Sequence, residues 1–116
     1  MNTPDYWQLL KITHNGESVY KVFGTWVGGY LNGDAWRINS GIVKVIEGDG
    51  FYDLIGHSGS IYRVSNHENV YRTNNYSQVV LEGLTERAQD ADADIEVIPF
   101  QEVEQTLKNI EYNEQV

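Results

Sequence analysis

The sequence predicts an α+β domain: a mainly antiparallel β-sheet of about six strands, curled or partly closed into a barrel, followed by two C-terminal helices. Two observations lead to this prediction. Glycine turns recur about every ten to fifteen residues between runs of β-branched and aromatic residues, which is typical of hairpins. Beyond residue 76, apolar residues recur at helical spacing instead. The 116 residues fit a single domain, 1–116, with one core.

Glycine turns divide the β-rich body, residues 1–65, into hairpins. Asn-Gly pairs favour the positive φ values of a type I′ turn, whose twist matches that of paired strands. The predicted strand pairs are Tyr6–Ile12 and Ser18–Phe23 around Asn15-Gly16, Thr25–Leu31 and Ala35–Asn39 around Asn32-Gly33, and Ile42–Ile46 and Phe51–Ile55 around Gly48-Asp49-Gly50. Ile61–Val64 adds a short strand. Both faces of Ile42–Ile46 are apolar, which predicts a strand covered on both sides.

Residues 77–116 are predicted to form an acidic helix–strand–helix end. Ser77 can cap a helix over about 77–89, and this helix presents an apolar face of Val80, Leu84 and Ala88. Ile95–Ile98 is the last short strand. A second amphipathic helix follows from the i, i+3, i+7, i+10 stripe of Phe100, Val103, Leu107 and Ile110.

The formal charge of −9 is unevenly placed along the chain. Residues 90–116 hold eight acidic residues and one basic residue, whereas residues 1–89 hold nine and seven. The body is therefore near neutral and the C-terminal end strongly acidic. Nucleic-acid binding needs clustered Lys and Arg to displace counterions from phosphates, so we expect no direct nucleic-acid partner.

The absence of cysteine excludes disulfide and thiolate chemistry and suits a reducing cytoplasm. The N-terminus lacks the basic start and apolar run of a signal peptide, and no stretch is long enough to span a bilayer. We therefore expect a cytoplasmic protein without membrane contact. His14, His57 and His67 are too scattered to suggest a metal site, and neither a metal nor a cofactor is expected.

Two segments resemble chemical motifs only in part. Asp90–Asp94 has carboxylates at alternate positions, as a calcium loop does, but Ile95 and Gln101 stand where an EF-hand needs Gly and Glu. A solvated acidic connector is the favoured interpretation. Asp53–Ser60 brings Asp, His and Ser together, yet strand neighbours point to opposite faces and no nucleophile elbow is present. A hydrolase using His57 and Asp53 is therefore less favoured than a hydrogen-bonded turn.

A concentration of aromatic residues with Arg and Asn is the most informative feature for function. Rings stack on planar ligands, guanidinium groups hold phosphate or carboxylate, and amides read hydrogen-bonding edges. The same residue types are enriched at protein interfaces, and they also fill small β cores. Core, ligand pocket and partner surface therefore all remain open. The candidate binding residues are Trp26, Tyr30, Trp36, Arg37, Asn39, Tyr62, Arg63 and Arg72, with Tyr71 and Tyr76 nearby in the sequence.

Four pieces of residues 6–65 together resemble uncharacterised small proteins of contractile-tailed bacteriophages. They are Tyr20-Lys21-Val22, Trp26-x-Gly28-Gly29-Tyr30, Trp36-Arg37-x-Asn39-Ser40-Gly41-Ile42 and Gly56-x-Ser58-Gly59-Ser60-x-Tyr62-Arg63. The resemblance implies the cytoplasm of a host bacterium, and it assigns no role to single residues.

The expected function in that setting is binding rather than catalysis. The first hypothesis is a non-enzymatic protein that binds and inhibits a host protein, in anti-defence or host takeover. The alternative is a binder that sequesters a nucleotide-like signalling molecule in an aromatic and arginine pocket. A homodimer is a further expectation, because pairing across a two-fold axis protects the edges of an open sheet.

Overall fold

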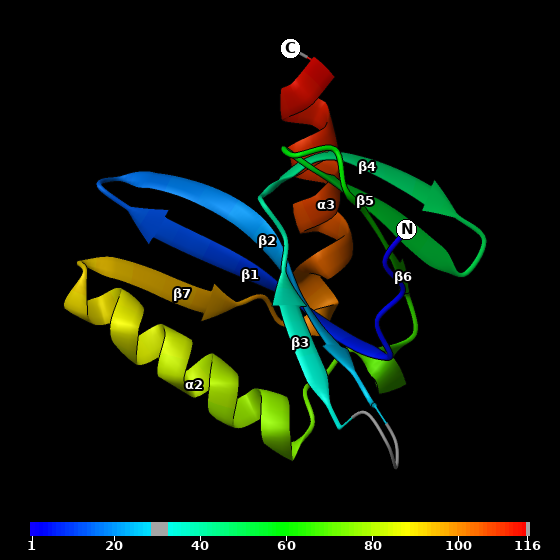
Figure 1. The fold of residues 1–116 in the computed structure, drawn as a ribbon. Helices are drawn as coiled ribbons and strands as arrows, with labels where there is room; N and C mark the ends of the chain where they lie inside the picture. Colours follow the sequence, from blue (N-terminus) through cyan, green and yellow to red (C-terminus); the bar gives the residue numbers. More distant parts are fainter. Residues whose placement is uncertain (29–32, 116) are drawn as a thin grey trace.

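A computed structural model describes residues 1–28 and 33–115, with side chains up to residue 110. In these ranges the chain forms seven antiparallel strands in two sheets, two α-helices and one short 3-10 helix, η1 (Glu68–Val70) (Figure 1). The predicted α+β class is confirmed, and the sheets do not close into a barrel. The four-stranded sheet has the order β3 (Ala35–Ile38), β2 (Glu17–Trp26), β1 (Tyr6–His14), β7 (Ala93–Val97). The three-stranded sheet has the order β4 (Ile42–Gly48), β5 (Phe51–Gly56), β6 (Ile61–Ser65).

The β1–β2 hairpin turns as predicted. Asn15 and Gly16 have φ values of 51° and 78°, the two positive values that a type I′ turn requires. The register then runs from His14 opposite Glu17 to Tyr6 opposite Thr25. β2 continues through Gly24 to Trp26, so the strand predicted to begin at Thr25 is the end of β2. Most of the rest of that predicted strand lies outside the described residues.

Residues 39–41 carry the chain from one sheet to the other. The Asn39 side chain is buried, with 4% of the residue exposed, and its Oδ1 accepts a hydrogen bond from the Val22 N–H at 2.8 Å. The Asn39 N–H in turn donates to the Val22 carbonyl at 3.1 Å. Gly41 has a φ of 118°, which L side chains rarely adopt. This glycine segment is thus a corner between two sheets.

The four-stranded sheet is covered on both faces. Helix α2 (Asn75–Asp90) packs on one face, where Leu81 meets Leu10 and Phe23. The other face joins the main core, to which the three-stranded sheet and helix α3 (Phe100–Gln115) also contribute. The buried residues of that core include Trp7, Leu9, Val22, Val45, Tyr52, Leu54, Tyr62, Val64, Val103 and Leu107.

The three-stranded sheet is buried on one face. Val45, Leu54 and Tyr62 are paired across the three strands and all belong to the main core. Ile46, the next residue of β4, is 46% exposed. The prediction that Ile42–Ile46 is covered on both sides is therefore wrong, because its apolar outer residues face away from the core.

Both C-terminal helices are confirmed, with one correction at a cap. Asn74, rather than Ser77, is the N-cap of α2. Its side chain accepts from the Ser77 N–H at 2.9 Å, while the Ser77 hydroxyl accepts from the Asn74 N–H at 3.0 Å. This reciprocal capping box starts the helix at Asn75. The predicted stripe of α3 is confirmed, since Val103 and Leu107 are buried and Phe100 and Ile110 pack beside them.

Tyr71 links the interior of β1 to Ile98, the residue that follows β7. Its hydroxyl accepts a hydrogen bond from the Leu9 N–H at 2.9 Å and donates to the Ile98 carbonyl. Its ring lies edge-on to Trp7 at a centroid distance of 4.9 Å. Burial raises the pKa of Tyr71 to about 12, because the phenolate would lose its hydration.

Candidate functional site

The structure distributes the predicted binding residues over several surfaces. Tyr30 lies outside the described residues. Asn39 is buried at the corner between the sheets. Trp36 points toward the α2 side of its sheet, where it stacks on Phe23 at 5.8 Å. The Arg72 guanidinium lies 5.1 Å from the centroid of the Tyr6 ring.

Three of the predicted residues do meet. Trp26 lies at the end of β2, with its ring 6.3 Å from that of buried Tyr62. The Arg37 guanidinium lies 5.9 Å from the Trp26 centroid, and its Nη1 donates to Asn2 Oδ1 at 3.4 Å. Within the described chain, no carboxylate forms a salt bridge with Arg37. Trp26 and Arg37, but not Tyr62, border a shallow hollow of about 310 Å³, whose other lining residues are Met1, Asn2, Thr3 and Ala35.

Arg63 occupies a different surface, the outer face of the three-stranded sheet. Its Nε and Nη2 donate to the two oxygens of Asp53 at 2.8 and 2.9 Å, a bidentate ion pair across β5 and β6. The guanidinium also covers the Phe51 ring at 4.0 Å. The hydrogen bond from Arg63 lowers the pKa of Asp53. Arg63 is thus held in one orientation while 42% of its side chain remains exposed.

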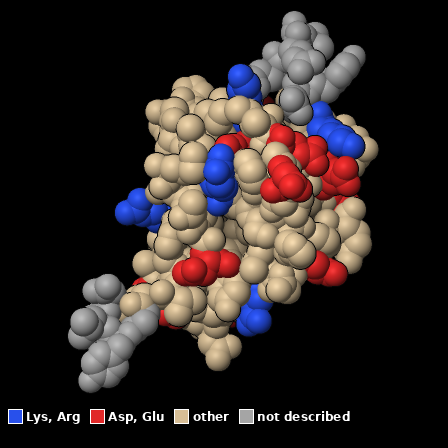
Figure 2. Space-filling view, turned by 90° about the vertical axis from the view of Figure 1, so that its right-hand side faces the viewer, with Lys and Arg blue, Asp and Glu red and all other residues tan. Residues whose placement is uncertain are grey.

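Apolar side chains surround this ion pair. Strand pairing aligns Lys44 with Ile55 and Ile61, and Ile46 with Asp53 and Arg63, on the face that turns away from α3. Figure 2 views the molecule from the side on which β4, β5 and β6 lie in Figure 1, and residues other than Lys, Arg, Asp and Glu cover most of it. We define the outer patch as Lys44, Ile46, Phe51, Asp53, Ile55, Ile61 and Arg63.

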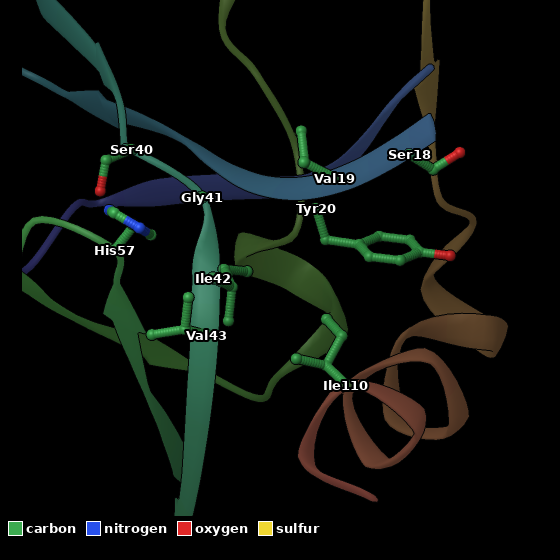
Figure 3. Close-up of a pocket in the computed structure, with 9 residues that line it drawn as sticks. All are labelled: Ser18, Val19, Tyr20, Ser40, Gly41, Ile42, Val43, His57 and Ile110. Atoms are coloured by element: carbon green, nitrogen blue, oxygen red, sulfur yellow. The ribbon is translucent and has the colours of Figure 1, made fainter. Parts of the chain in front are cut away.

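A separate apolar groove of about 440 Å³ lies between β2, β4 and α3. Figure 3 shows β2 crossing the view and β4 running away from it, with Tyr20, Ile42 and Ile110 extending into the space between them. Its remaining lining residues are Ser18, Val19, Ser40, Gly41, Val43 and His57. None of the predicted binding residues that the structure describes lines this groove.

The hydrolase-like residues are separated. Asp53 is bound by Arg63 on the outer face, whereas His57 lies in the exposed turn between β5 and β6. Ser58 of that turn is bonded to Ser40 of the corner between the sheets: the Ser40 hydroxyl donates to Ser58 Oγ at 3.1 Å and accepts from the Ser58 N–H at 2.9 Å. Among the described side chains, those of residues 1–28 and 33–110, no group of three or more His, Asp and Glu could hold a metal ion.

Sequence reasoning missed most of the outer patch. Ile46, Phe51, Ile55 and Ile61 look like core residues in a sequence, because β-branched and aromatic side chains fill β cores. The available signal was the two-sided apolar character of Ile42–Ile46, which we interpreted as burial on both faces.

Comparisons with known proteins found no match to this chain among family models, curated proteins or solved structures. Among the described helices, none has the length and apolar character needed to cross a membrane.

Proposed function

We propose that this chain is a non-enzymatic interaction protein that binds and inhibits a host bacterial protein through the outer patch. One observation carries the proposal: a sheet face rich in Ile and Phe turns away from the core and surrounds an arginine that is already fixed in place. The anti-defence or host-takeover setting comes from the resemblance to phage proteins.

The outer patch has the composition of a binding surface. Its Ile and Phe side chains are partly exposed, and covering them would gain about 25 cal/mol per Å² of apolar area. Arg is enriched at interface hot spots. Arg63 loses little further freedom on binding, because Asp53 and Phe51 already fix its position.

The charges of the patch indicate the kind of partner. Asp53 neutralises Arg63, so a strongly acidic partner surface would gain little from it. A flat surface with apolar and aromatic residues fits better. The acidic residues of the C-terminal end would add long-range attraction toward a basic partner, and this attraction would weaken as the salt concentration rises.

The test compares captures from a lysate of the host bacterium. Wild type, I46K, R63A and the control V79K serve as bait. Val79 is the matched control for Ile46, because it is an exposed β-branched apolar residue that lies on α2, away from the outer patch. We expect wild type and V79K to retain one protein that I46K and R63A lose. Titration of that purified protein should give a Kd at least tenfold weaker for I46K and R63A than for wild type. Equal capture by all four baits would refute the proposal.

A second candidate function is favoured by the hollow beside Trp26 and Arg37. An exposed guanidinium next to an indole can hold a planar anion, such as a nucleotide-like signalling molecule. A ligand that binds only the folded state must raise the melting temperature. We expect a nucleotide panel to raise the Tm of wild type and not that of R37A. No shift with any nucleotide would exclude this candidate.

A further inference from the structure

Part of β2 is an open sheet edge. β3 pairs with β2 only over residues 23–26, and in the described chain residues 17–21 pair with β1 alone. Asn39 binds both the N–H and the carbonyl of Val22, which therefore point away from β1. Because these directions alternate along a strand, the N–H and carbonyl groups of Ser18 and Tyr20 also point away from β1, on the side of the groove that they line.

The open edge has a defined length. The Asn15-Gly16 turn closes it at one end, and Asn39 blocks it at the other. Five residues, 17–21, remain between these limits. Their two outward-facing residues, Ser18 and Tyr20, stand symmetrically about Val19, which is 47% exposed. An unpaired edge of this kind is a template for another strand.

We propose that two copies of this chain pair antiparallel along residues 17–21, around a two-fold axis at Val19. In this register Ser18 of each copy lies opposite Tyr20 of the other. Each of these two pairs exchanges both backbone hydrogen bonds, so four bonds use all the outward N–H and carbonyl groups of Ser18 and Tyr20. The two four-stranded sheets become one sheet of eight strands.

Side-chain charge selects the same register. Glu17 and Lys21 flank Val19 at equal distances in sequence, so the two-fold axis places Glu17 of one copy opposite Lys21 of the other, twice. Val19 meets its own symmetry mate in a non-hydrogen-bonded pair, where side chains lie closest. Centring the axis on Glu17 or Lys21 instead would oppose like charges. Centring it on Tyr20 would place Ser18 against Val22, whose outward groups Asn39 already occupies.

Apolar surface adjoins the open edge. β4 runs away from β2, and the groove of about 440 Å³ lies beside the open edge (Figure 3). Tyr20, Ile42 and Ile110 supply apolar surface there. A contact of five residues on each strand is smaller than a standard protein interface, so we expect a weak dimer that dissociates on dilution.

Charge reversal tests the proposal by sedimentation equilibrium over a series of protein concentrations. E17K and K21E each place like charges opposite one another at both 17–21 pairs of the dimer. Each should therefore weaken dimerisation at least tenfold. The double variant E17K/K21E restores opposite charges and should restore the wild-type constant. V19K should also weaken the dimer, whereas the matched control V79K should not. A wild-type monomer at every concentration, an E17K dimer of unchanged strength, or a double variant that fails to recover would each overturn the proposal.

A disulfide gives an independent readout of the register. The chain has no cysteine, so V19C would carry its only thiol. Directly opposed residues of a non-hydrogen-bonded pair have Cα atoms about 4.5 Å apart, within the range that a disulfide spans. We expect V19C to form a covalent dimer under mild oxidation, faster than V79C at equal concentration. Equal rates for the two variants would contradict pairing centred on Val19.

Discussion

The two sheets are built from similar residues but are covered differently. The four-stranded sheet has α2 on one face and the main core on the other, whereas the three-stranded sheet has the core on one face and the outer patch on the other. The buried apolar residues of the first sheet are explained by packing, and Val19 at its open edge is an exception. Ile46 and its neighbours on the second sheet are not explained by packing, because their exposed area gains little on folding. The difference separates the region that stabilises the fold from the region available for binding.

The largest expected effect lies where the two sheets meet. Trp7 is 1% exposed, contacts Tyr52 and Tyr71 edge-on, and donates from Nε1 to the Ser65 carbonyl at 2.8 Å. Trp7→Ala leaves a cavity and an unpaired carbonyl, so we expect the free energy of unfolding to fall by about 3–5 kcal/mol. Urea denaturation measures it. A loss below about 1 kcal/mol would show that this junction does not dominate stability.

A second effect of junction burial should appear at high pH. Folding raises the pKa of Tyr71 from 10.0 to about 12. The contribution of the neutral Tyr71 side chain to the free energy of unfolding is therefore complete below pH 10 and is lost as the pH rises toward 12. The full loss is about 2–3 kcal/mol. Urea denaturation of wild type and Tyr71→Phe from pH 8 to about pH 12 measures it.

The Tyr71→Phe variant should start less stable, by about 1–3 kcal/mol, because the Leu9 N–H and Ile98 carbonyl lose their partner. It should then lose less stability than wild type in alkali. A residual decline is expected because burial also raises the pKa of Tyr52 and Tyr62. Tyr76→Phe, which alters an exposed tyrosine, is the control. Parallel pH curves for wild type and Tyr71→Phe would contradict the assignment.

Local chemistry accounts for the parts of the fold that the sequence predicted. The Asn15-Gly16 turn and the α3 stripe depend on neighbouring residues, and both are confirmed. The corner at Ser40-Gly41 depends on Asn39 reaching Val22, a contact between segments that no local pattern encodes. The sequence places the α2 cap three residues too late, because Ser77 is a good N-cap type that serves here as the N3 residue of the capping box.

The candidate site was harder to predict because side-chain direction decides it. Trp36 and Arg37 are neighbours in sequence, yet strand alternation sends one toward α2 and the other toward Trp26. Trp26, Arg37 and Tyr62 do come together, across β2, β3 and β6. Arg63 lies apart from them, because the pairing of β6 with β5 places it opposite Asp53. Composition alone could not show this.

A smaller effect should distinguish the ion pair of the outer patch from the buried junction. Since Arg63 lowers the pKa of Asp53, the pair contributes stability above the ordinary carboxyl pKa, and this contribution is lost as the pH falls through the folded-state value. Arg63→Lys keeps the charge but not the bidentate geometry. NMR titration of the Asp53 carboxyl carbon should therefore give a higher pKa in the variant. An unchanged pKa would mean that the paired geometry seen here does not govern Asp53.

The smallest effect on stability should come from the residue most important to the proposed interface. Ile46→Lys replaces a half-exposed side chain on the open face, so we expect the free energy of unfolding to change by no more than about 0.5 kcal/mol, as for other surface substitutions. The same substitution is expected to abolish capture of the partner. Urea denaturation of Ile46→Lys beside Trp7→Ala measures the contrast directly. A loss of several kcal/mol would show that Ile46 stabilises the fold, and its apolar character would then need no partner to explain it.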